Sequence, residues 1–142
     1  MKKLKLSFER KRVDDDLLHM PLESAEHAYR LFKEMENEVR EKVVCIHLTG
    51  KYEIISFEVV SIGTQTYAIA DPVEILRGAV LVRAATIIIL HNHPLGSPEP
   101  SEADVEGAKK LKEKGAVLNI SLRDAIIIGD GGFVSLAERG LL

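Results

Sequence analysis

The sequence predicts an α/β domain in which a mixed β-sheet is flanked by helices. The chain has 142 residues, about the usual size of one domain, and its 46% hydrophobic and 29% charged residues are typical of globular proteins. Strand-like segments are interspersed with segments of helical periodicity, and one buried-strand pattern lies between two predicted helices. We find no internal repeat or low-complexity tract, so we expect residues 1–142 to form a single domain.

The N-terminal half predicts a strand, a helix and a β-hairpin. Leu4, Leu6 and Phe8 alternate with polar residues, which is the period of a half-buried strand, and we expect residues 1–23 to supply this strand and a connection. Ser24 is a favourable N-cap before apolar residues at helical spacing. Two later runs rich in β-branched and aromatic residues flank a short polar turn, as in a hairpin. The expected elements are a strand around 3–9, a helix over about 25–38 and paired strands over 43–48 and 52–61.

The C-terminal half predicts two further helices around a buried strand, followed by short strands. Asp71 is followed by a proline, which together start a helix. A β-branched run from Thr86 ends at His91, so this histidine is expected at the end of a buried strand. Ser101 opens the last helix, and we expect Gly115 to end it in a left-handed conformation. The expected elements are a loop or irregular strand over 63–70, helices ending near 83 and 114, and strands over 86–90, 116–122, 125–128 and 133–136.

Charge and cysteine content narrow the function classes. Nineteen basic against 22 acidic residues give a net charge of −3, whereas a protein that binds nucleic acid over a broad surface usually has a basic excess. The charge therefore disfavours nucleic-acid binding without excluding it. Cys45 is the single cysteine, and neither a signal peptide nor an apolar run of membrane-spanning length is found. We expect a cytoplasmic protein that does not enter the membrane.

The segment 91–104 carries the strongest chemical signal. His91 and His93 are two positions apart on extended backbone, so their side chains project from one side with Cα atoms roughly 6.5 Å apart, within reach of one cation. The prolines and the glycine that follow form a stiff, turned loop that can bring the next helix back over the strand end. Asp104 in the first turn of that helix could then supply a carboxylate. A His₂Asp set leaves a fourth position for water, as in catalytic zinc sites, and imidazole plus carboxylate favours Zn²⁺.

Several of these residues also have purely structural interpretations. Ser101 and Asp104 match a capping box, although Asp is shorter than the usual Glu or Gln. The joint pattern of paired histidines, a Pro/Gly-rich loop and Ser-x-x-Asp nevertheless favours a metal site. Cys45 and His47 share a strand face, but two candidate ligands without further partners favour core packing. Residues 129–132 lack the ending of a phosphate loop and predict a hairpin turn.

The same segment resembles a family signature. His91, His93, Ser101 and Asp104, with the glycine and prolines between them, are similar to the JAMM signature, His-x-His followed after seven residues by Ser-x-x-Asp. The version is that of the RadC-like branch of JAB/MPN domains, and the similarity extends over roughly residues 38–142. The resemblance implies the cytidine-deaminase-like α/β sandwich of MPN domains.

The resemblance further implies a zinc-dependent hydrolase that cleaves a peptide or isopeptide bond in a peptide or protein substrate. Such enzymes use a glutamate near the start of an early strand, and Glu41 occupies the place that looks equivalent, with Glu38 as its rival. A carboxylate there could take a proton from the attacking water and return it to the leaving amine. Ser101 could donate a hydrogen bond to the oxyanion. Two alternatives stay open: a non-catalytic metal-containing binding module, and a metal-dependent nuclease or DNA-repair-associated factor.

Overall fold

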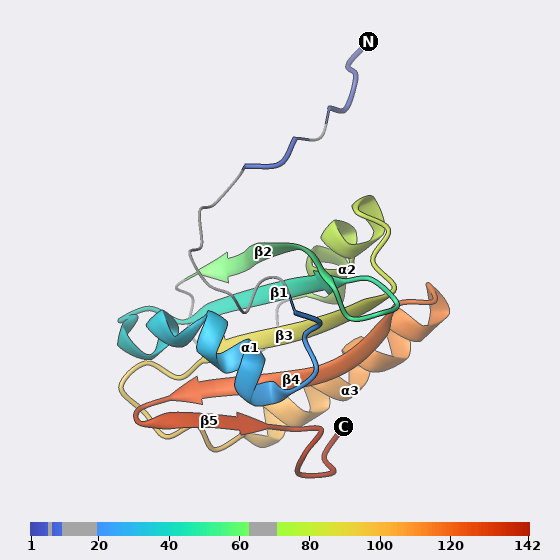
Figure 1. Ribbon diagram of the computed structural model, residues 1–142. Helices are drawn as coiled ribbons and strands as arrows, with labels where there is room; N and C mark the ends of the chain where they lie inside the picture. Colours follow the sequence, from blue (N-terminus) through green and yellow to red (C-terminus); the bar gives the residue numbers. More distant parts are fainter. Residues whose placement is uncertain (6, 10–19, 63–70) are drawn as a thin grey trace.

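The computed structural model describes residues 1–5, 7–9, 20–62 and 71–142, which form a five-stranded mixed sheet with helices on both faces (Figure 1). The strands are β1 (Lys42–Leu48), β2 (Ile54–Ile62), β3 (Thr86–Asn92), β4 (Ser121–Gly129) and β5 (Gly132–Ser135). The helices are α1 (Ala25–Leu31), the 3₁₀ helix η2 (Lys33–Asn37), α2 (Pro72–Leu81) and α3 (Glu102–Val117). The sheet order is β2-β1-β3-β4-β5, with β3 and β4 parallel and the other neighbours antiparallel. The predicted α/β class is confirmed, and the arrangement is consistent with the JAB/MPN fold.

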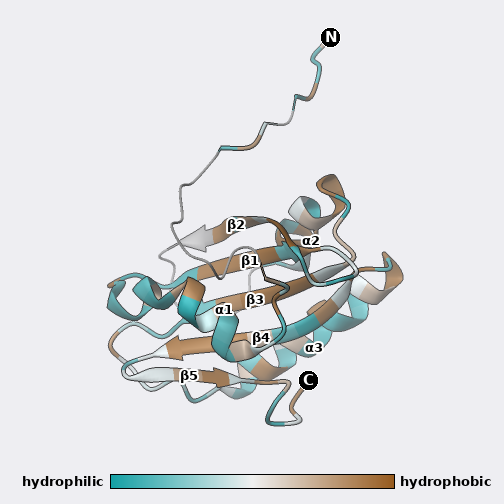
Figure 2. Cartoon of the chain, in the orientation of Figure 1, coloured by the Kyte–Doolittle hydropathy of each residue, from teal (hydrophilic) through white to brown (hydrophobic). Residues whose placement is uncertain are grey.

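The helices build one apolar core on each face of the sheet. The segment of α1 and η2 packs on one face, where Ile88 and Leu90 of β3 point. Helices α2 and α3 pack on the other face, against Ile87 and Ile89. Successive residues of a strand point to opposite faces, so β3 supplies both cores, and its hydrophobic colour along the centre of the sheet is visible in Figure 2.

β3, α3 and β4 form a βαβ unit, which is the connection that a parallel strand pair requires. The unit brings the C-terminal end of β3 and the N-terminal end of α3 together through the loop 93–101. Ligand sites of α/β sheets are typically found at the carboxyl ends of parallel strands. The predicted metal-ligand segment therefore lies at the edge of the sheet where such sites form.

Most predicted elements are confirmed, but the first helix is shorter than expected. α1 ends at Leu31, and the chain leaves α geometry at Phe32 before continuing as η2. Residues three apart lie on one line in a 3₁₀ helix, so this change places both Phe32 and Met35 in the core beneath. Phe32 also packs edge-to-face on Phe57, with ring centroids 5.2 Å apart. Val39, the last apolar residue at helical spacing in this segment of the sequence, is 77% exposed.

The end of α3 also differs from the expectation. Gly115 lies inside the helix, and Asn119 takes the left-handed conformation instead, with φ 57°. The N–H of Asn119 donates to Ala116 O and that of Ile120 to Gly115 O, which is a Schellman motif. Gly115 is required for another reason, because a Cβ there would lie 2.6 Å from the carbonyl oxygen of Ile120.

Two predicted strands are corrected. The predicted strand over 116–122 is not formed as one element: residues 116–117 end α3, residues 118–120 form the turn after it, and residues 121–122 begin β4, which continues without interruption through the predicted 125–128. The described part of residues 1–9 forms no strand, with Leu4 77% and Phe8 69% exposed, so period-two alternation there has no sheet to pack on. Residues 10–19, which belong to the expected N-terminal connection, lie outside the described residues. The expected loop over 63–70 also lies outside them.

The longest helix described, α3, has 16 residues and carries many lysines and glutamates. No described helix meets the requirements of a transmembrane span.

Candidate metal centre

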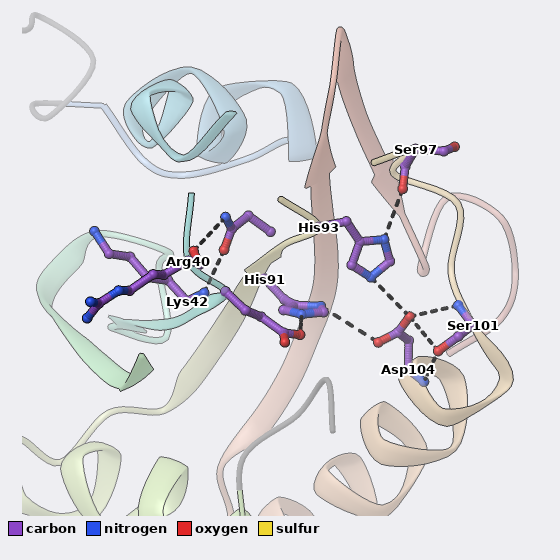
Figure 3. A network of polar contacts seen from close by, with 9 residues as sticks. Arg40, Lys42, His91, His93, Ser97, Ser101 and Asp104 are labelled. Carbon is purple, nitrogen blue, oxygen red and sulfur yellow. Dashed lines mark hydrogen bonds and ion pairs between the residues drawn. The ribbon is translucent and has the colours of Figure 1, made fainter. Parts of the chain in front are cut away.

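His91 and His93 lie at the C-terminal end of β3, where the chain leaves the sheet. His91 continues the row of Ile87 and Ile89 on the face covered by α2 and α3, and His93, two positions later, projects to the same side (Figure 3). Their ring centroids are 4.9 Å apart and the rings are nearly perpendicular. The expectation that alternation brings both imidazoles together is therefore met.

The loop that follows packs against the end of β4 and the turn between β4 and β5. The N–H of His93 donates to Ile128 O at 2.8 Å, and the N–H of Asp130 donates to Gly96 O at 2.8 Å. A Cβ on Gly129 would lie 2.6 Å from that same oxygen of Gly96. The sequence predicted only a hairpin turn at this glycine, whereas the structure shows that its lack of a side chain lets the histidine loop approach.

Asp104 is held by the capping box and still faces both histidines. The Ser101 N–H and hydroxyl each donate to Asp104 Oδ2 at 2.7 Å, and the Asp104 N–H donates to Ser101 Oγ at 3.1 Å. Asp104 Oδ2 lies 3.4 Å from His93 Nε2, and Oδ1 lies 3.7 Å from His91 Nδ1. The structural interpretation of Ser-x-x-Asp is thus correct, and it does not compete with the cluster because the box uses one carboxylate oxygen.

The three side chains place their ligand atoms close enough together to bind one divalent cation. One ligand atom from each of His91, His93 and Asp104 lies within 4.8 Å of the others. His91 Nδ1 and Asp104 Oδ1 are buried without a hydrogen-bond partner among the described residues, although buried polar atoms are normally paired. Ligands around a tetrahedral ion with bonds of about 2.0 Å lie about 3.3 Å apart, close to the separations found here. The residues therefore fit a metal ion.

The electrostatics prepare two of the three groups for metal binding. Burial lowers the pKa of His91, and the carboxylates of Glu41 and Asp104 only partly oppose this effect. Burial alone would raise the pKa of Asp104, but hydrogen bonds from His93 and Ser101 outweigh it and lower that pKa to about 2. The contact with Asp104 raises the pKa of His93. Metal ligands must be unprotonated, so the lowered pKa values of His91 and Asp104 favour metal binding, whereas the raised pKa of His93 opposes it.

Glu41 lies beside the cluster although it is 50 positions from His91 in the chain. It immediately precedes β1, and the pairing of Val43 with His91 brings it to the end of β3. Its carboxylate contacts His91 Nε2. Glu38, the rival candidate, forms an ion pair with Lys42 instead.

The other candidate ligands occupy core positions. Cys45 is completely buried, and burial raises the pKa of its thiol. His47 Nδ1 is 2.9 Å from Ser56 Oγ, and burial lowers the pKa of His47 to about 4. Within the described part of the chain, the only group of three that could hold a metal is the His91 cluster. The core interpretation of Cys45 and His47 agrees with this finding.

Sequence reasoning assigned no role to Asn92, which the structure places next to the Glu41 segment. Asn92 is 1% exposed, and its Nδ2 donates to Arg40 O at 3.1 Å while its Oδ1 accepts from Lys42 N at 2.6 Å. Figure 3 shows Arg40 and Lys42 on the side of His91 away from Asp104. The available signal was alternation, since a residue between two histidines of one face must point to the other face.

Comparisons with known proteins identify relatives that share most of this chain. A family model described as RadC-like JAB domain matches residues 22–141. A UPF0758 protein of Methanosarcina acetivorans is 40% identical over 112 residues, 79% of this chain and 49% of its own length. One of Enterococcus faecalis is 41% identical over 116 residues, 82% of this chain and 50% of its own, and one of Caldanaerobacter subterraneus is 42% identical over 110 residues, 78% and 47%. The chain spans about half the length of these relatives.

Proposed function

This chain belongs to the RadC-like JAB domain family, and we propose that it is a zinc-dependent hydrolase that cleaves a peptide or isopeptide bond in a peptide or protein substrate. The observation that carries the proposal is the pair of unpartnered buried atoms, His91 Nδ1 and Asp104 Oδ1, with the Glu41 carboxylate on the other side of the His91 ring. These two atoms face each other at 3.7 Å within a cluster of three possible ligands, so one cation would satisfy both of them. We further propose that the protein works in the cytoplasm, where a buried free cysteine such as Cys45 stays reduced.

His91, His93 and Asp104 would hold the ion. When bound, Zn²⁺ would polarise the substrate carbonyl and lower the pKa of a water molecule. The rigidity of the three side chains supports this role: one lies within a buried strand, one is fixed by a 2.9 Å contact between His93 Nδ1 and Ser97 O, and one is fixed by the capping box.

Glu41 would act as the general base and then as the general acid. A carboxylate at this position can accept a proton from the attacking water and deliver it to the leaving amine nitrogen. Its side chain is 24% exposed, so it can meet a substrate, while its contact with His91 keeps it at the cluster.

Ser101 would donate a hydrogen bond to the oxyanion of the tetrahedral intermediate. Its hydroxyl has one proton, which is directed at Asp104 Oδ2 in the structure. Rotation of the O–H bond would redirect that proton towards substrate, while Oγ continues to accept from the Asp104 N–H and to cap α3.

The proposal is tested with zinc-loaded protein on a panel of peptide and isopeptide substrates, using Glu41→Gln and the matched control Glu38→Gln. We expect the wild type to turn over substrate. The turnover rate should fall about 10²-fold or more in Glu41→Gln with the metal retained, and should change by no more than about threefold in Glu38→Gln. Glu38 is a fair control because it lies in the same segment and is engaged by Lys42.

Three outcomes would contradict the proposal. Metal retention without turnover on the whole panel would indicate a binding module. DNA cleavage that His93→Ala abolishes would indicate a nuclease. An equal loss in both glutamine variants would reject Glu41 as the base.

A further inference from the structure

Three consecutive residues at the end of β3 divide between the two faces of the sheet. His91 and His93 point towards α3, whereas Asn92 continues the row of Ile88 and Leu90 on the opposite face. A buried amide in an apolar row is costly unless both of its polar atoms are paired. Asn92 pairs both of them, and both partners belong to the segment that carries Glu41.

The pairing occurs where the ladder between β1 and β3 ends. Val43 opposite His91 is the last pair of that ladder, and Lys42 would face Asn92 in the next position. There the backbone of Asn92 pairs with Ile128 of β4. The Asn92 side chain takes over towards β1, with Oδ1 accepting from Lys42 N at 2.6 Å and Nδ2 donating to Arg40 O at 3.1 Å.

These two bonds bracket Glu41. They fix the peptide groups before and after it, although Glu41 itself lies outside every strand. Only a side-chain amide both donates and accepts at this length, because a carboxylate lacks the donor and a hydroxyl is too short to span both groups. The same side chain extends from the backbone between the two metal-ligand histidines.

We propose that Asn92 is a positioning residue that fixes Glu41 beside His91, so that one tripeptide supplies two metal ligands on one face and the anchor of the general base on the other. The catalytic meaning of this inference rests on the proposed function. Displacement of a catalytic group by about 1 Å can cost 10²-fold in rate, which sets the expected size of the effect.

The first test does not depend on activity. Backbone amide hydrogen exchange is measured by NMR on the metal-free full chain for the wild type, Asn92→Ala and the matched control Ser135→Ala. Ser135 is also buried, and it also donates one hydrogen bond, to Asp124, and accepts one, from the Glu138 N–H. We expect exchange at Lys42 to accelerate about tenfold in Asn92→Ala and to stay unchanged in Ser135→Ala. Unchanged exchange at Lys42 in Asn92→Ala would overturn the proposal.

The second test is a double-mutant cycle in which the turnover rate of the zinc-loaded protein is measured. We expect the turnover rate of Asn92→Ala to fall about 100-fold with its metal content unchanged. The turnover rate of Ser135→Ala should stay within about threefold of the wild type. In the Glu41→Gln background, Asn92→Ala should have an effect of less than about threefold, because its target is already gone. Losses that multiply in the double variant would show that Asn92 does not act through Glu41, and would overturn the positioning role.

A further variant covers the case in which Asn92→Ala does not fold. Asn92→Asp has the same shape and keeps the acceptor for the Lys42 N–H, but it removes the donor to Arg40 O. We expect exchange at Lys42 to stay slow and turnover to fall at least tenfold; full turnover would overturn the proposal. If the wild type has no turnover on any substrate, the proposed function fails, and the exchange measurement still decides whether Asn92 holds the Glu41 segment.

Discussion

His91 Nδ1 and Asp104 Oδ1 face each other across 3.7 Å in the interior of the protein, and neither atom has a hydrogen-bond partner among the described residues. The two side chains come from different elements, the end of β3 and the first turn of α3. A cation between strand and helix would satisfy both atoms, so binding of the ion should be measurable as stability.

We expect one Zn²⁺ per chain, and at 100 times its dissociation constant it should raise the free energy of unfolding by about 2.7 kcal/mol. Asp104→Asn should lose this gain, because it removes the anionic ligand. Asp124→Asn is the matched control, since Asp124 is a buried aspartate outside the cluster. Metal content and urea unfolding with and without chelator check the prediction, and an equal zinc-dependent gain in Asp104→Asn would contradict it.

Gly129→Ala should disturb the metal centre from a distance. Its Cβ would lie 2.5 Å from Pro98 N and 2.6 Å from Gly96 O, so the histidine loop must shift. We expect a loss of about 1–3 kcal/mol in unfolding free energy and zinc affinity at least tenfold weaker. Gly50→Ala is the control, because nothing lies within 4 Å of a Cβ there, and we expect a change within about 0.5 kcal/mol. Unchanged zinc affinity in Gly129→Ala would show that the loop tolerates the contact.

Ser101→Ala should weaken the N-terminal cap of α3. It removes the acceptor for the Asp104 N–H and one of the two hydrogen bonds from Ser101 to Asp104 Oδ2, so we expect a loss of about 1 kcal/mol in unfolding free energy. Ser101→Thr keeps the hydroxyl and should lose less. Urea unfolding of the metal-free chains checks this order, and equal stability of all three proteins would contradict the capping role.

His47 should make the protein sensitive to acid. Burial lowers its pKa from 6.5 to about 4, so between these values the unfolded chain binds a proton that the folded chain excludes. Stability is therefore lost as pH falls through this window, by about 2 kcal/mol between pH 7 and pH 5 from this group. His47→Asn has no titrating group at this position, so its unfolding free energy should fall by that much less over the same interval. Equal slopes in the two proteins would contradict the prediction.

The sequence predicted the features that depend on neighbouring residues. Alternation placed His91 and His93 on one side, and the Ser-x-x-Asp spacing predicted both the capping box and the place of Asp104. What it missed depends on contacts between distant segments: Asn92 bonds a segment 50 positions away, and Gly129 matters because another loop lies against it. The predicted strand over 116–122 is wrong because a short hydrophobic run fits the end of a helix as well as a strand.

The candidate metal ligands are close together in the sequence, whereas the proposed general base is far from them. All three candidate ligands lie within the continuous segment 91–104, which a single loop closes, whereas Glu41, the proposed general base, lies 50 positions from His91 and reaches it through the pairing of β1 with β3. Shorter loops close at lower entropic cost, so we expect a partly assembled molecule to capture zinc before Glu41 is in place. Metal stoichiometry would then overstate the competent fraction of a preparation, and titration of active sites is the appropriate measure of correctly folded protein.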